Sequence, residues 1–339
     1  MIIALAGGVG GARLAKGLAL ALPADRLAVV VNVGDDFEHL GLHVSPDIDT
    51  VLYTLAGLAN PATGWGREGE SWQFMAALSQ LGGENWFQLG DLDLATHVER
   101  THRLRSGEPL SAITARFAER LGIGAAIVPV TDAPLRTMVD TDEGTLAFQE
   151  YFVHRQCRPR VTGFRFEGAA ATTPSAPLAA LMARDDIEGI VVCPSNPWLS
   201  IDPLLAVPGL REWIEARGLP VVAVSPVVGG KAVKGPAGKI MDELGIEVSA
   251  LGVARHYGAG VQRWVIDERD AALAPQIEKL DGVERIESIG RRVRVTDTMM
   301  TEPPEVHRLS LPRTLRLAEA CLEELAAARG AQGRAAHRA

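Results

Sequence analysis

A glycine-rich string with one arginine follows the first apolar run of the chain. The string GGVGGAR covers residues 7–13, directly after the apolar residues 2–6 and before a segment with helical spacing. Glycines at such a turn let the backbone approach a ligand, and a helix N-terminus presents N–H groups and a positive dipole to a phosphate. Arg13 stands where a dinucleotide-binding G-x-G-x-x-G pattern needs glycine, and no Gly-Lys-Ser/Thr follows at the P-loop offset. The string therefore predicts a phosphate site, with a plain tight turn as the alternative, and its candidate residues are Gly8, Gly10, Gly11 and Arg13.

Carboxylates follow the second apolar run, residues 27–31. Asp35 and Asp36 come first, at a position where a carboxylate often binds a ribose hydroxyl, although a turn or helix cap explains them equally well. The string SPDIDT, residues 45–50, then leads into an apolar helix, with Ser as N-cap, Pro at the first helical position and acids in the first turn. Asp49 lies deeper than a cap requires. Two acids close together in a glycine-lined cleft can hold Mg²⁺ or a substrate hydroxyl, so we predict such a role for Asp49.

A second pair of carboxylates stands at another predicted helix start, in the string QLGDLDLATH at residues 88–97. Asp93 and His97 share one helix face at the i, i+4 spacing, close to Arg100 and Arg103. The string is consistent with a catalytic or metal-binding group that includes Asp91 and Asp93. A capped, salt-bridged surface helix is the alternative of equal weight.

Two further loops carry polar residues after apolar runs. Ser195 and Asn196 lie between prolines in CPSNP, which follows residues 187–193, and stiff turns of this kind aim side chains at a ligand. The glycine-rich loop after residues 220–224 contains Gly230, Lys231 and Lys234, which predict a second anion site. Lysines that are simply solvated are the alternative.

Composition and spacing exclude several classes of protein. The formal net charge of −8 argues against broad binding to nucleic acid, and the three cysteines show no spacing typical of a disulfide framework or thiolate zinc site. The eight histidines form no H-E-x-x-H pattern, and no G-x-S-x-G elbow occurs. No apolar run reaches the roughly 18 residues of a membrane helix, and the apolar start is a strand rather than a signal peptide. We therefore expect a cytoplasmic protein.

The order of the elements indicates an α/β fold. Continuous apolar strands at 2–6, 27–31, 187–193 and 220–224, each followed by a polar turn, predict a mostly parallel, Rossmann-like sheet with helices on both faces. We predict helices at 12–22, 71–81, 95–105 and 313–329, a smaller β-rich insertion at about 135–166 and a loop at 303–312. Residues 1–330 would form one catalytic unit and 331–339 a flexible tail.

Several strings in one order resemble a known family. GGVGGAR, NVGDD, SPDIDTVLYTLAG, LGDLDLATH, VVCPSNPWLSIDP and SPVVGGKAVKGPAGK resemble the 2-phospho-L-lactate transferase family of coenzyme F-420 biosynthesis, over nearly the whole chain. The DIDT, LGDxDxATH, CPSNP and VGGxxxKGPA strings are far more specific than the glycine cluster.

The resemblance implies a Mg²⁺-dependent transfer. The donor is a guanosine diphosphate (GDP) ester of lactate, enolpyruvate or glycerate, the acceptor is the ribityl hydroxyl of Fo (7,8-didemethyl-8-hydroxy-5-deazariboflavin), and GMP leaves. Members are homodimers. The family's Fo contacts map onto Asp49 and onto Gln88, where some members carry lysine. Asp49, Asp91 and Asp93 are then the candidate catalytic residues, with Asp49 and Asp91 as metal ligands.

Two other functions remain as alternatives. A nucleotide-sugar-binding regulatory protein of the same fold shares the opening strings, but such relatives follow the acidic pair with a Gly-Gly-Ser-rich stretch that this chain lacks. A nicotinamide oxidoreductase is disfavoured by Arg13 in the fingerprint. Which acid the donor carries does not follow from the sequence.

Overall fold

A seven-stranded sheet forms the centre of the protein in the computed structural model, which describes residues 1–280, 291–300 and 312–336. The strand order is β14-β13-β10-β9-β1-β2-β5, and all neighbouring pairs are parallel. β1, β2, β9, β10 and β13 are buried along their whole length, as expected for a sheet covered on both faces. The strands are β1 (Ile2–Ala6), β2 (Leu27–Val31), β5 (Ala126–Pro129), β9 (Gly189–Val192), β10 (Val221–Val224), β13 (Arg263–Ile266) and β14 (Arg292–Val295).

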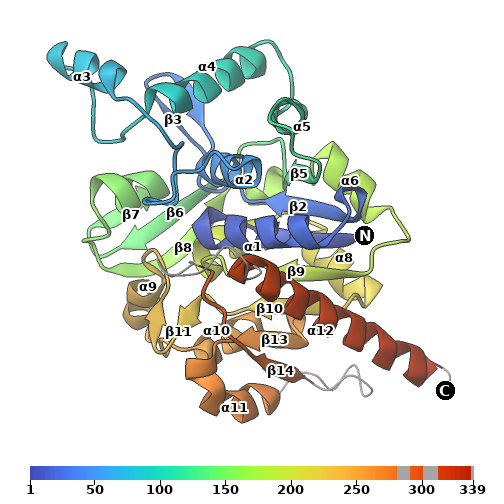
Figure 1. Cartoon of the computed structure of the whole chain (residues 1–339). Helices are drawn as coiled ribbons and strands as arrows, with labels where there is room; N and C mark the ends of the chain where they lie inside the picture. Colours follow the sequence, from blue (N-terminus) through green and yellow to red (C-terminus); the bar gives the residue numbers. More distant parts are fainter. Residues whose placement is uncertain (281–290, 301–311, 337–339) are drawn as a thin grey trace.

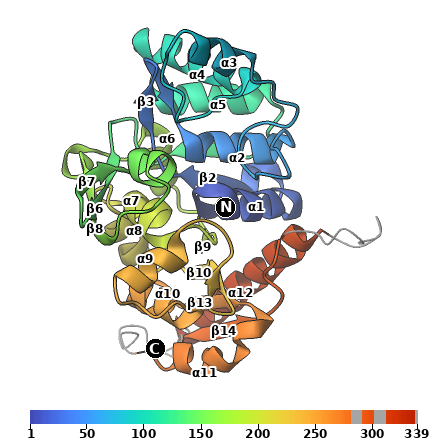
Figure 2. The same ribbon diagram turned by 90° about the vertical axis from the view of Figure 1, so that its left-hand side faces the viewer.

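The helices form layers around this sheet (Figure 1). α1 packs against both α2 and α12, and α12 also contacts β10 and β13. α3 and α4 lie at one end of the molecule, and α11 lies at the other (Figure 2). The helices are α1 (Gly8–Ala21), α2 (Pro46–Ala56), α3 (Gln73–Gln80), α4 (Asp91–Arg105), α5 (Leu110–Arg120), α6 (Ala176–Met182), α7 (Asp202–Leu205), α8 (Leu210–Arg217), α9 (Ala237–Glu243), α10 (Ala250–Tyr257), α11 (Ala274–Glu278) and α12 (Arg313–Ala336).

The order of the strands creates a switch point beside β1. From β1 the chain proceeds to β2 and β5 on one side, and it then returns to β9, β10, β13 and β14 on the other. The carboxyl ends of β1, β2 and β9 therefore meet at one edge, where ligands bind in open parallel sheets. The glycine string, Asp35, Asp36 and the CPSNP string all follow these three strands.

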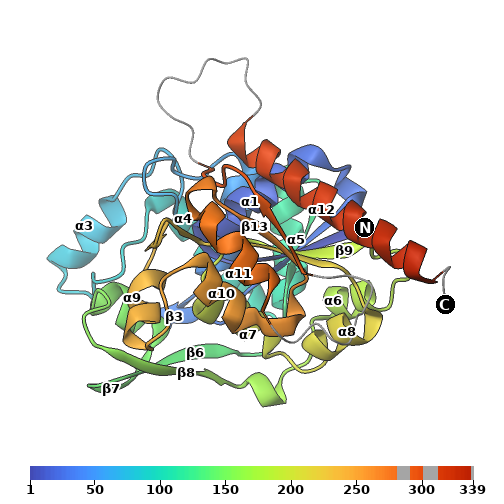
Figure 3. The ribbon, with the colours of Figure 1, turned by 90° about the horizontal axis from the view of Figure 1, so that it is seen from below.

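Small antiparallel sheets surround this edge. β6, β7 and β8 form a three-stranded sheet on the opposite side of the central sheet from α1 and α12 (Figure 3). Two hairpins, β3–β4 and β11–β12, follow β2 and β10. These strands are β3 (Phe37–His39), β4 (Leu42–Val44), β6 (Arg136–Thr141), β7 (Gly144–Ala147), β8 (Val161–Glu167), β11 (Val227–Val228) and β12 (Lys231–Ala232).

The predicted fold class is confirmed, including the smaller β-containing insertion, which corresponds to β6–β8. The first two strands have the predicted bounds, whereas α4 begins at Asp91 rather than at residue 95. α12 continues to Ala336, beyond the predicted end at 329, because the alanines, glutamine and arginine after residue 330 favour helix enough to carry it past two glycines, Gly330 and Gly333. The predicted tail at 331–339 is therefore helical as far as Ala336, and residues 337–339 lie outside the described residues, as does nearly all of the predicted loop at 303–312.

The division into one unit and a tail otherwise stays a prediction. Among the helices in the described ranges, none has both the length and the apolar character needed to cross a membrane.

Candidate functional site

Three buried carboxylates, here called the strand-end acids, gather at the switch point: Asp35, Asp36 and Asp47. Their exposed fractions are 4%, 2% and 7%. Asp47 lies in the first turn of α2 and accepts hydrogen bonds from the backbone N–H of Gly8 at 2.5 Å and from Asn32 Nδ2 at 2.9 Å. Its own backbone N–H donates to Asp35 Oδ2 at 3.1 Å. α1, β2 and α2 thus meet around one acidic side chain.

Two of the strand-end acids, Asp35 and Asp47, are short of positive charge. Burial raises the pKa of Asp47 to about 6, and burial together with the charge of Asp47 raises the pKa of Asp35 well above its usual value. In the described part of the chain, the partners of Asp35 and Asp47 are N–H groups and hydroxyls rather than lysine or arginine side chains. Carboxylate oxygens are what Mg²⁺ prefers, so this pair fits a divalent cation by donor type and by its unmet charge.

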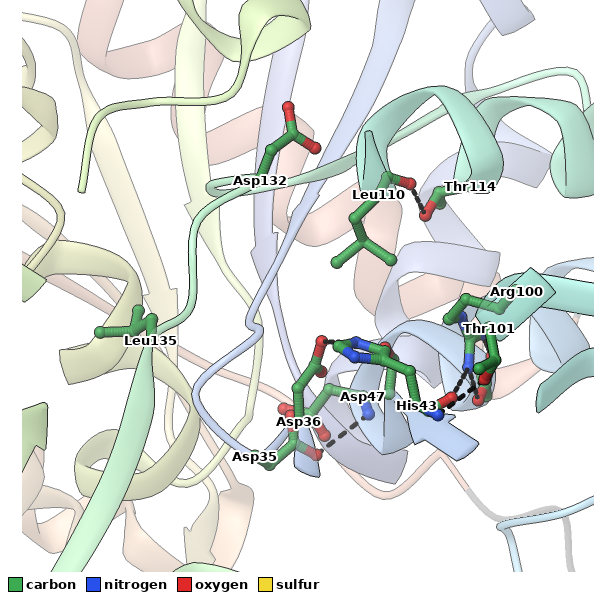
Figure 4. Close-up of polar contacts among 12 residues, drawn as sticks. Asp35, Asp36, His43, Asp47, Arg100, Thr101, Leu110, Thr114, Asp132 and Leu135 are labelled. Carbon is green, nitrogen blue, oxygen red and sulfur yellow. Dashed lines mark hydrogen bonds and ion pairs between the residues drawn. The ribbon is translucent and has the colours of Figure 1, made fainter. Parts of the chain in front are cut away.

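Asp36 joins the strand-end acids to the β3–β4 hairpin. Its Oδ2 accepts a hydrogen bond from Ser45 Oγ at 2.8 Å. The same oxygen lies 3.0 Å from His43 Nε2 (Figure 4). Ser45 therefore does not cap α2 with its side chain, contrary to the prediction, because its hydroxyl is drawn to Asp36 instead. Asp36 Oδ1 is buried and has no hydrogen-bond partner among the described residues.

A second group, here called the arginine network, consists of Asp49, Asp93, His97 and Arg100. Arg100, 1% exposed, donates from both terminal nitrogens to the Asp49 carboxylate, from Nη1 at 3.0 Å. His97 Nδ1 lies 3.6 Å from Asp49 Oδ2, and its Nε2 lies 3.3 Å from Asp93 Oδ2. Tyr53 donates its hydroxyl to Asp93 at 2.6 Å. The i, i+4 pair predicted on α4 is thus present, and it faces Asp49 on α2.

The arginine network offers a less suitable metal site than the strand-end acids. One ligand atom each from Asp49, Asp93 and His97 lie within 4.8 Å of one another, which is close enough to surround an ion. The guanidinium of Arg100, however, already neutralises Asp49 and would repel a divalent cation beside it. An ion-paired network that holds its carboxylates in place is the better interpretation.

The structure does not bring Asp91, one of the two predicted metal ligands, together with Asp49. Asp91 is partly exposed and accepts hydrogen bonds from Ser71 Oγ at 2.5 Å and from the backbone N–H groups of Gln73 and Phe74 at 3.1 Å. Its carboxylate therefore holds the first turn of α3. Gln88 is exposed and donates to the backbone carbonyl of Asn85 at 2.7 Å.

The predicted glycines lie where α1 begins, against the loop after β9. Gly8 has a φ of +62°, and a Cβ on Gly10 would lie 2.3 Å from the carbonyl oxygen of Pro194. A Cβ on Gly11 would lie 2.5 Å from Ser195 Oγ, which is hydrogen-bonded to the backbone of Gly7. Gly8 is thus required by its positive φ, and Gly10 and Gly11 are required by close packing against the loop after β9.

The predicted polar residues of the CPSNP string also face inward. Asn196 Oδ1 accepts from the backbone N–H groups of Trp198 and Leu199. Its Nδ2 is buried and has no hydrogen-bond partner in the ranges that the structure describes. Asn196 therefore keeps one donor available beside the glycine string.

Two of the predicted cations lie close to each other. Burial lowers the pKa of Arg13, and burial followed by the charge of Arg13 lowers the pKa of Lys234. Lys234 Nζ donates to the carbonyl oxygen of Thr63 at 2.8 Å, so the loop after β12 meets the loop after α2 over the start of α1. Gly230 and Lys231 lie in the β11–β12 hairpin, where Lys231 is exposed.

Sequence reasoning assigned no role to Asn32, His43 or Tyr53. Their carboxylate partners lie 15, 7 and 40 residues away, and each pair joins two different segments of the fold, so no spacing within one helix or strand reveals it. The sequence places Arg100 close to His97, but it does not indicate that Arg100 pairs with Asp49, which is 51 residues away. One signal in the sequence could have indicated such residues. Several acids follow β2 within a short stretch, and buried acids need basic or polar partners from other parts of the chain.

Comparisons with known proteins agree on one family. The sequence model of "2-phospho-L-lactate transferase CofD" matches residues 2–299. A "Phosphoenolpyruvate transferase" of Streptomyces griseus is 41% identical over 89% of this chain and 93% of its own length. A "2-phospho-L-lactate transferase" of Methanosarcina acetivorans is 36% identical over 91% of this chain and 96% of its own length.

A solved structure supports the fold independently. A UPF0052-family protein of Bacillus halodurans has a TM-score of 0.56 at 15% identity, covering 95% of this chain and 99% of its own. This likeness concerns the fold alone, whereas the sequence matches identify the family. Since the family model spans residues 2–299 and relatives above one-third identity align over about nine-tenths of the chain, the protein belongs to the 2-phospho-L-lactate transferase CofD family and is a transferase of coenzyme F-420 biosynthesis.

Proposed function

We propose that this transferase moves a phospho-acid group from a GDP-linked donor to the ribityl hydroxyl of Fo and releases GMP. The observation that carries the proposal is the meeting of two kinds of charge at one sheet edge. Asp35 and Asp47 lack a paired cation there among the described residues, and Arg13 and Lys234 lie beside the start of α1. A divalent cation would neutralise Asp35 and Asp47, and a diphosphate would bring negative charge next to Arg13 and Lys234.

Asp35 and Asp47 are the residues that would hold Mg²⁺, in place of the predicted pair Asp49 and Asp91. The two acids contact each other through the Asp47 backbone and supply oxygens only. When bound there, Mg²⁺ supplies positive charge that offsets the diphosphate. The N–H groups in the first turn of α1 beyond that of Gly8, which donates to Asp47, would bind the remaining phosphate oxygens together with Arg13 and Lys234 and fix the donor's orientation.

The transfer itself requires one proton to leave the acceptor. The oxygen of the ribityl hydroxyl attacks the phosphorus that bears the acid, and the bond from that phosphorus to the bridging oxygen breaks, so that GMP leaves with this oxygen. We propose that Asp49 receives the hydroxyl proton. Arg100 occupies one direction on each Asp49 oxygen and leaves further lone pairs for the substrate. Asp93 and His97 would then position Asp49 and Arg100.

The most specific element of the proposal is the identity of the acid that the donor carries. The Streptomyces relatives are named for phosphoenolpyruvate and the Methanosarcina relatives for 2-phospho-L-lactate. The Streptomyces proteins are somewhat more similar to this chain, so the enolpyruvate donor is the first to test. The lactate and glycerate donors are the matched comparisons.

The test is a reaction of the purified protein with Fo, Mg²⁺ and each of the three GDP-linked donors. GMP release and the mass of the deazaflavin product are followed, and we expect a product from at least one donor. Activity should vanish in EDTA and return with excess Mg²⁺. Absence of product with all three donors would refute the proposed transfer, and full activity in EDTA would refute the Mg²⁺ requirement.

A thermal-shift panel separates the proposed transferase from a nucleotide-sugar-binding regulatory protein and from a nicotinamide oxidoreductase. GDP should raise the melting temperature because a bound ligand stabilises the folded state by mass action, whereas a uridine sugar or NAD should not. The resemblance also implies a homodimer, which light scattering on the purified protein tests directly.

A further inference from the structure

The small sheet β6–β8 contacts the turn after β2, which carries Asp35. β7 pairs with β6 as far as Met138, which lies opposite Ala147. Next to this pair, the backbone N–H of Thr137 on β6 donates to the carbonyl oxygen of Gly34 at 2.7 Å. The turn after β2 therefore takes the place beside β6 that β7 leaves.

A side chain that follows β7 contacts the next peptide group of the same turn. Gln149 lies two residues after the end of β7 and is 6% exposed. Its Nε2 donates to the backbone carbonyl oxygen of Asp35 at 3.4 Å. Thr137 and Gln149 thus bind two successive carbonyl groups, those of Gly34 and Asp35. These contacts fix the backbone from which the Asp35 carboxylate projects.

The two segments approach each other closely at Gly34. A Cβ on this residue would lie 2.7 Å from Thr137 Oγ1, 2.8 Å from Pro203 Cβ and 3.0 Å from Asn32 Oδ1. The φ of Gly34 is not in the left-handed region, so space rather than backbone conformation requires a glycine here. Thr137 Oγ1 and Asn32 Oδ1 therefore lie on the same side of Gly34. Asn32 in turn donates from Nδ2 to Asp47, so the Thr137 hydroxyl lies close to the strand-end acids.

The Thr137 hydroxyl is buried and unpaired. Thr137 is 1% exposed, and its Oγ1 has no hydrogen-bond partner in the ranges that the structure describes. Most buried polar groups do have a partner, because an unpaired one costs free energy. Valine has nearly the same shape as threonine and would avoid this cost, so packing alone does not account for a hydroxyl at this position. The hydroxyl is therefore available to an oxygen atom that arrives with a ligand.

We propose that the small sheet completes the donor and metal site through Gln149 and Thr137. Gln149 is a positioning residue that holds Asp35, and the Thr137 hydroxyl donates to an oxygen that arrives with Mg²⁺, either of a metal-bound water or of the diphosphate. This inference rests on the proposed function, because it assigns partners to an acid that would bind the metal. Groups that hold a metal ligand in this way orient it and change the metal affinity.

A different explanation is that these contacts only attach the small sheet to the central sheet. Two substitutions of Thr137 separate the explanations, because serine keeps the hydroxyl and loses the methyl group, whereas valine keeps the shape and loses the hydroxyl. Gln149→Met keeps the bulk of that side chain and removes its donor. Thr145→Val is the matched control, since Thr145 lies exposed on β7 of the same sheet and donates to Asp140 at 2.6 Å.

The experiment measures, by calorimetry on full-length proteins, the affinity for Mg²⁺ alone and the affinity for GDP with Mg²⁺ present, together with the melting temperature without ligand. We expect Thr137→Val to weaken GDP binding by roughly 10- to 100-fold, as for the loss of a hydrogen bond to a charged group. Its ligand-free melting temperature should stay equal or rise, because an unpaired buried hydroxyl is removed. Thr137→Ser should bind GDP within about threefold of the wild type. Gln149→Met should weaken Mg²⁺ binding by roughly 10- to 100-fold, and Thr145→Val should match the wild type.

The titration with Mg²⁺ alone identifies the partner of the Thr137 hydroxyl. A parallel loss of Mg²⁺ affinity in Thr137→Val indicates a metal-bound water, and an unchanged Mg²⁺ affinity indicates a diphosphate oxygen. Wild-type GDP affinity in Thr137→Val, or an equal loss in Thr145→Val, would overturn the role of the hydroxyl, and wild-type Mg²⁺ affinity in Gln149→Met would overturn the positioning role. Failure of the proposed function looks different, because the wild-type protein itself would then show no Mg²⁺-dependent binding of GDP.

Discussion

Asp47 and Asp49 stand two residues apart in the first turn of α2, yet their surroundings are opposite. Asp47 faces the strand ends, where the backbone N–H of Gly8 and the side chains of Asn32 and Ser200 contact it, and where burial and the charge of Asp36 raise its pKa. Asp49 faces α4, where the Arg100 guanidinium pairs with both of its oxygens. The first turn of α2 therefore carries two different carboxylates. Asp47 has no cation beside it in the described part of the chain, whereas Asp49 is paired with Arg100.

The difference separates two uses of buried acids. A buried carboxylate without a counter-charge is costly, and proteins tolerate it where a cation is going to bind. A paired carboxylate is held in a fixed geometry, and breaking the pair leaves a buried charge behind. We infer that the strand-end acids serve the metal and the donor, and that the arginine network serves the acceptor.

The largest effect, a loss of turnover, should come from substitution of Asp49, the acid that is paired with Arg100. Asp49→Asn removes the group proposed to accept the hydroxyl proton, and general-base contributions amount to about 10²–10⁴-fold in rate. Turnover per folded molecule, measured well below the melting temperature, should fall by this factor while GDP affinity stays near the wild-type value. A loss of only a few-fold would contradict a role for Asp49 in proton transfer.

Arg100→Met breaks the same pair from the other side and provides the next largest effect. It leaves the Asp49 carboxylate buried and unpaired, which should lower the free energy of unfolding by about 3–5 kcal/mol. Urea unfolding measures the change. The double variant Asp49→Leu/Arg100→Met should recover most of that loss, because it removes both charges at similar volume.

Comparison of the two single variants then tests the division of roles. Both break the ion pair, so both should destabilise the fold. Only Asp49→Asn should also reduce the rate per folded molecule by orders of magnitude. If Arg100→Met reduces that rate equally, the network acts as one positioning unit and Asp49 has no separate chemical role.

Sequence reasoning predicted the scaffold well because the scaffold depends on local patterns. Continuous apolar runs gave the bounds of β1 and β2, and the polar turns after them identified the right edge of the sheet. The i, i+4 relation of Asp93 and His97 was likewise local, and the structure places the pair as predicted. Elements with short or mixed apolar character, such as β13 and β14, gave no such signal and were not predicted.

The pairing of acids was harder to predict because it depends on contacts across the fold. Asp91 has the spacing of an active-site acid, but Ser71 and the start of α3 bind it instead. Asp47 was interpreted as a first-turn acid, although Gly8 and Asn32 draw it to the strand ends. Nothing in local spacing distinguishes Asp47 from Asp49; their partners on other elements do.

The unpaired acids are tested by metal and pH together. In EDTA, the raised pKa of Asp47, about 6 against an ordinary 3.8, means that the folded state binds this proton more tightly than the unfolded state. The stabilisation of the folded state by this proton is fully present below about pH 4. It is lost as pH rises through 6, which lowers the free energy of unfolding by about 3 kcal/mol. Mg²⁺ should therefore raise the melting temperature strongly at pH 8 and little at pH 5.

Asp35→Asn should abolish that Mg²⁺ response, since one of the two proposed ligands loses its charge. Its side-chain oxygen can still accept the Asp47 backbone N–H, so the fold should persist. Asp91→Asn is the matched control, and it should keep the full response because its carboxylate holds α3 instead. If Asp91→Asn instead abolishes the Mg²⁺ response and Asp35→Asn keeps it, Asp91 binds the metal, as predicted from the sequence.

The smallest effect concerns the donor end. Arg13→Ala removes one cation beside the start of α1, and a hydrogen bond to a charged group contributes about 1.5–3 kcal/mol. GDP affinity, measured by calorimetry, should fall roughly 10- to 100-fold, with Lys234→Ala acting in the same direction. Lys231→Ala is the control, because this exposed hairpin lysine should leave GDP affinity within about twofold. The Arg13 effect should also shrink at 1 M salt, where the screening length falls to about 3 Å. If Lys231→Ala lowers GDP affinity and Arg13→Ala does not, the diphosphate binds at the β11–β12 hairpin, away from the strand-end acids. The metal would then lie apart from the phosphates that it is proposed to neutralise.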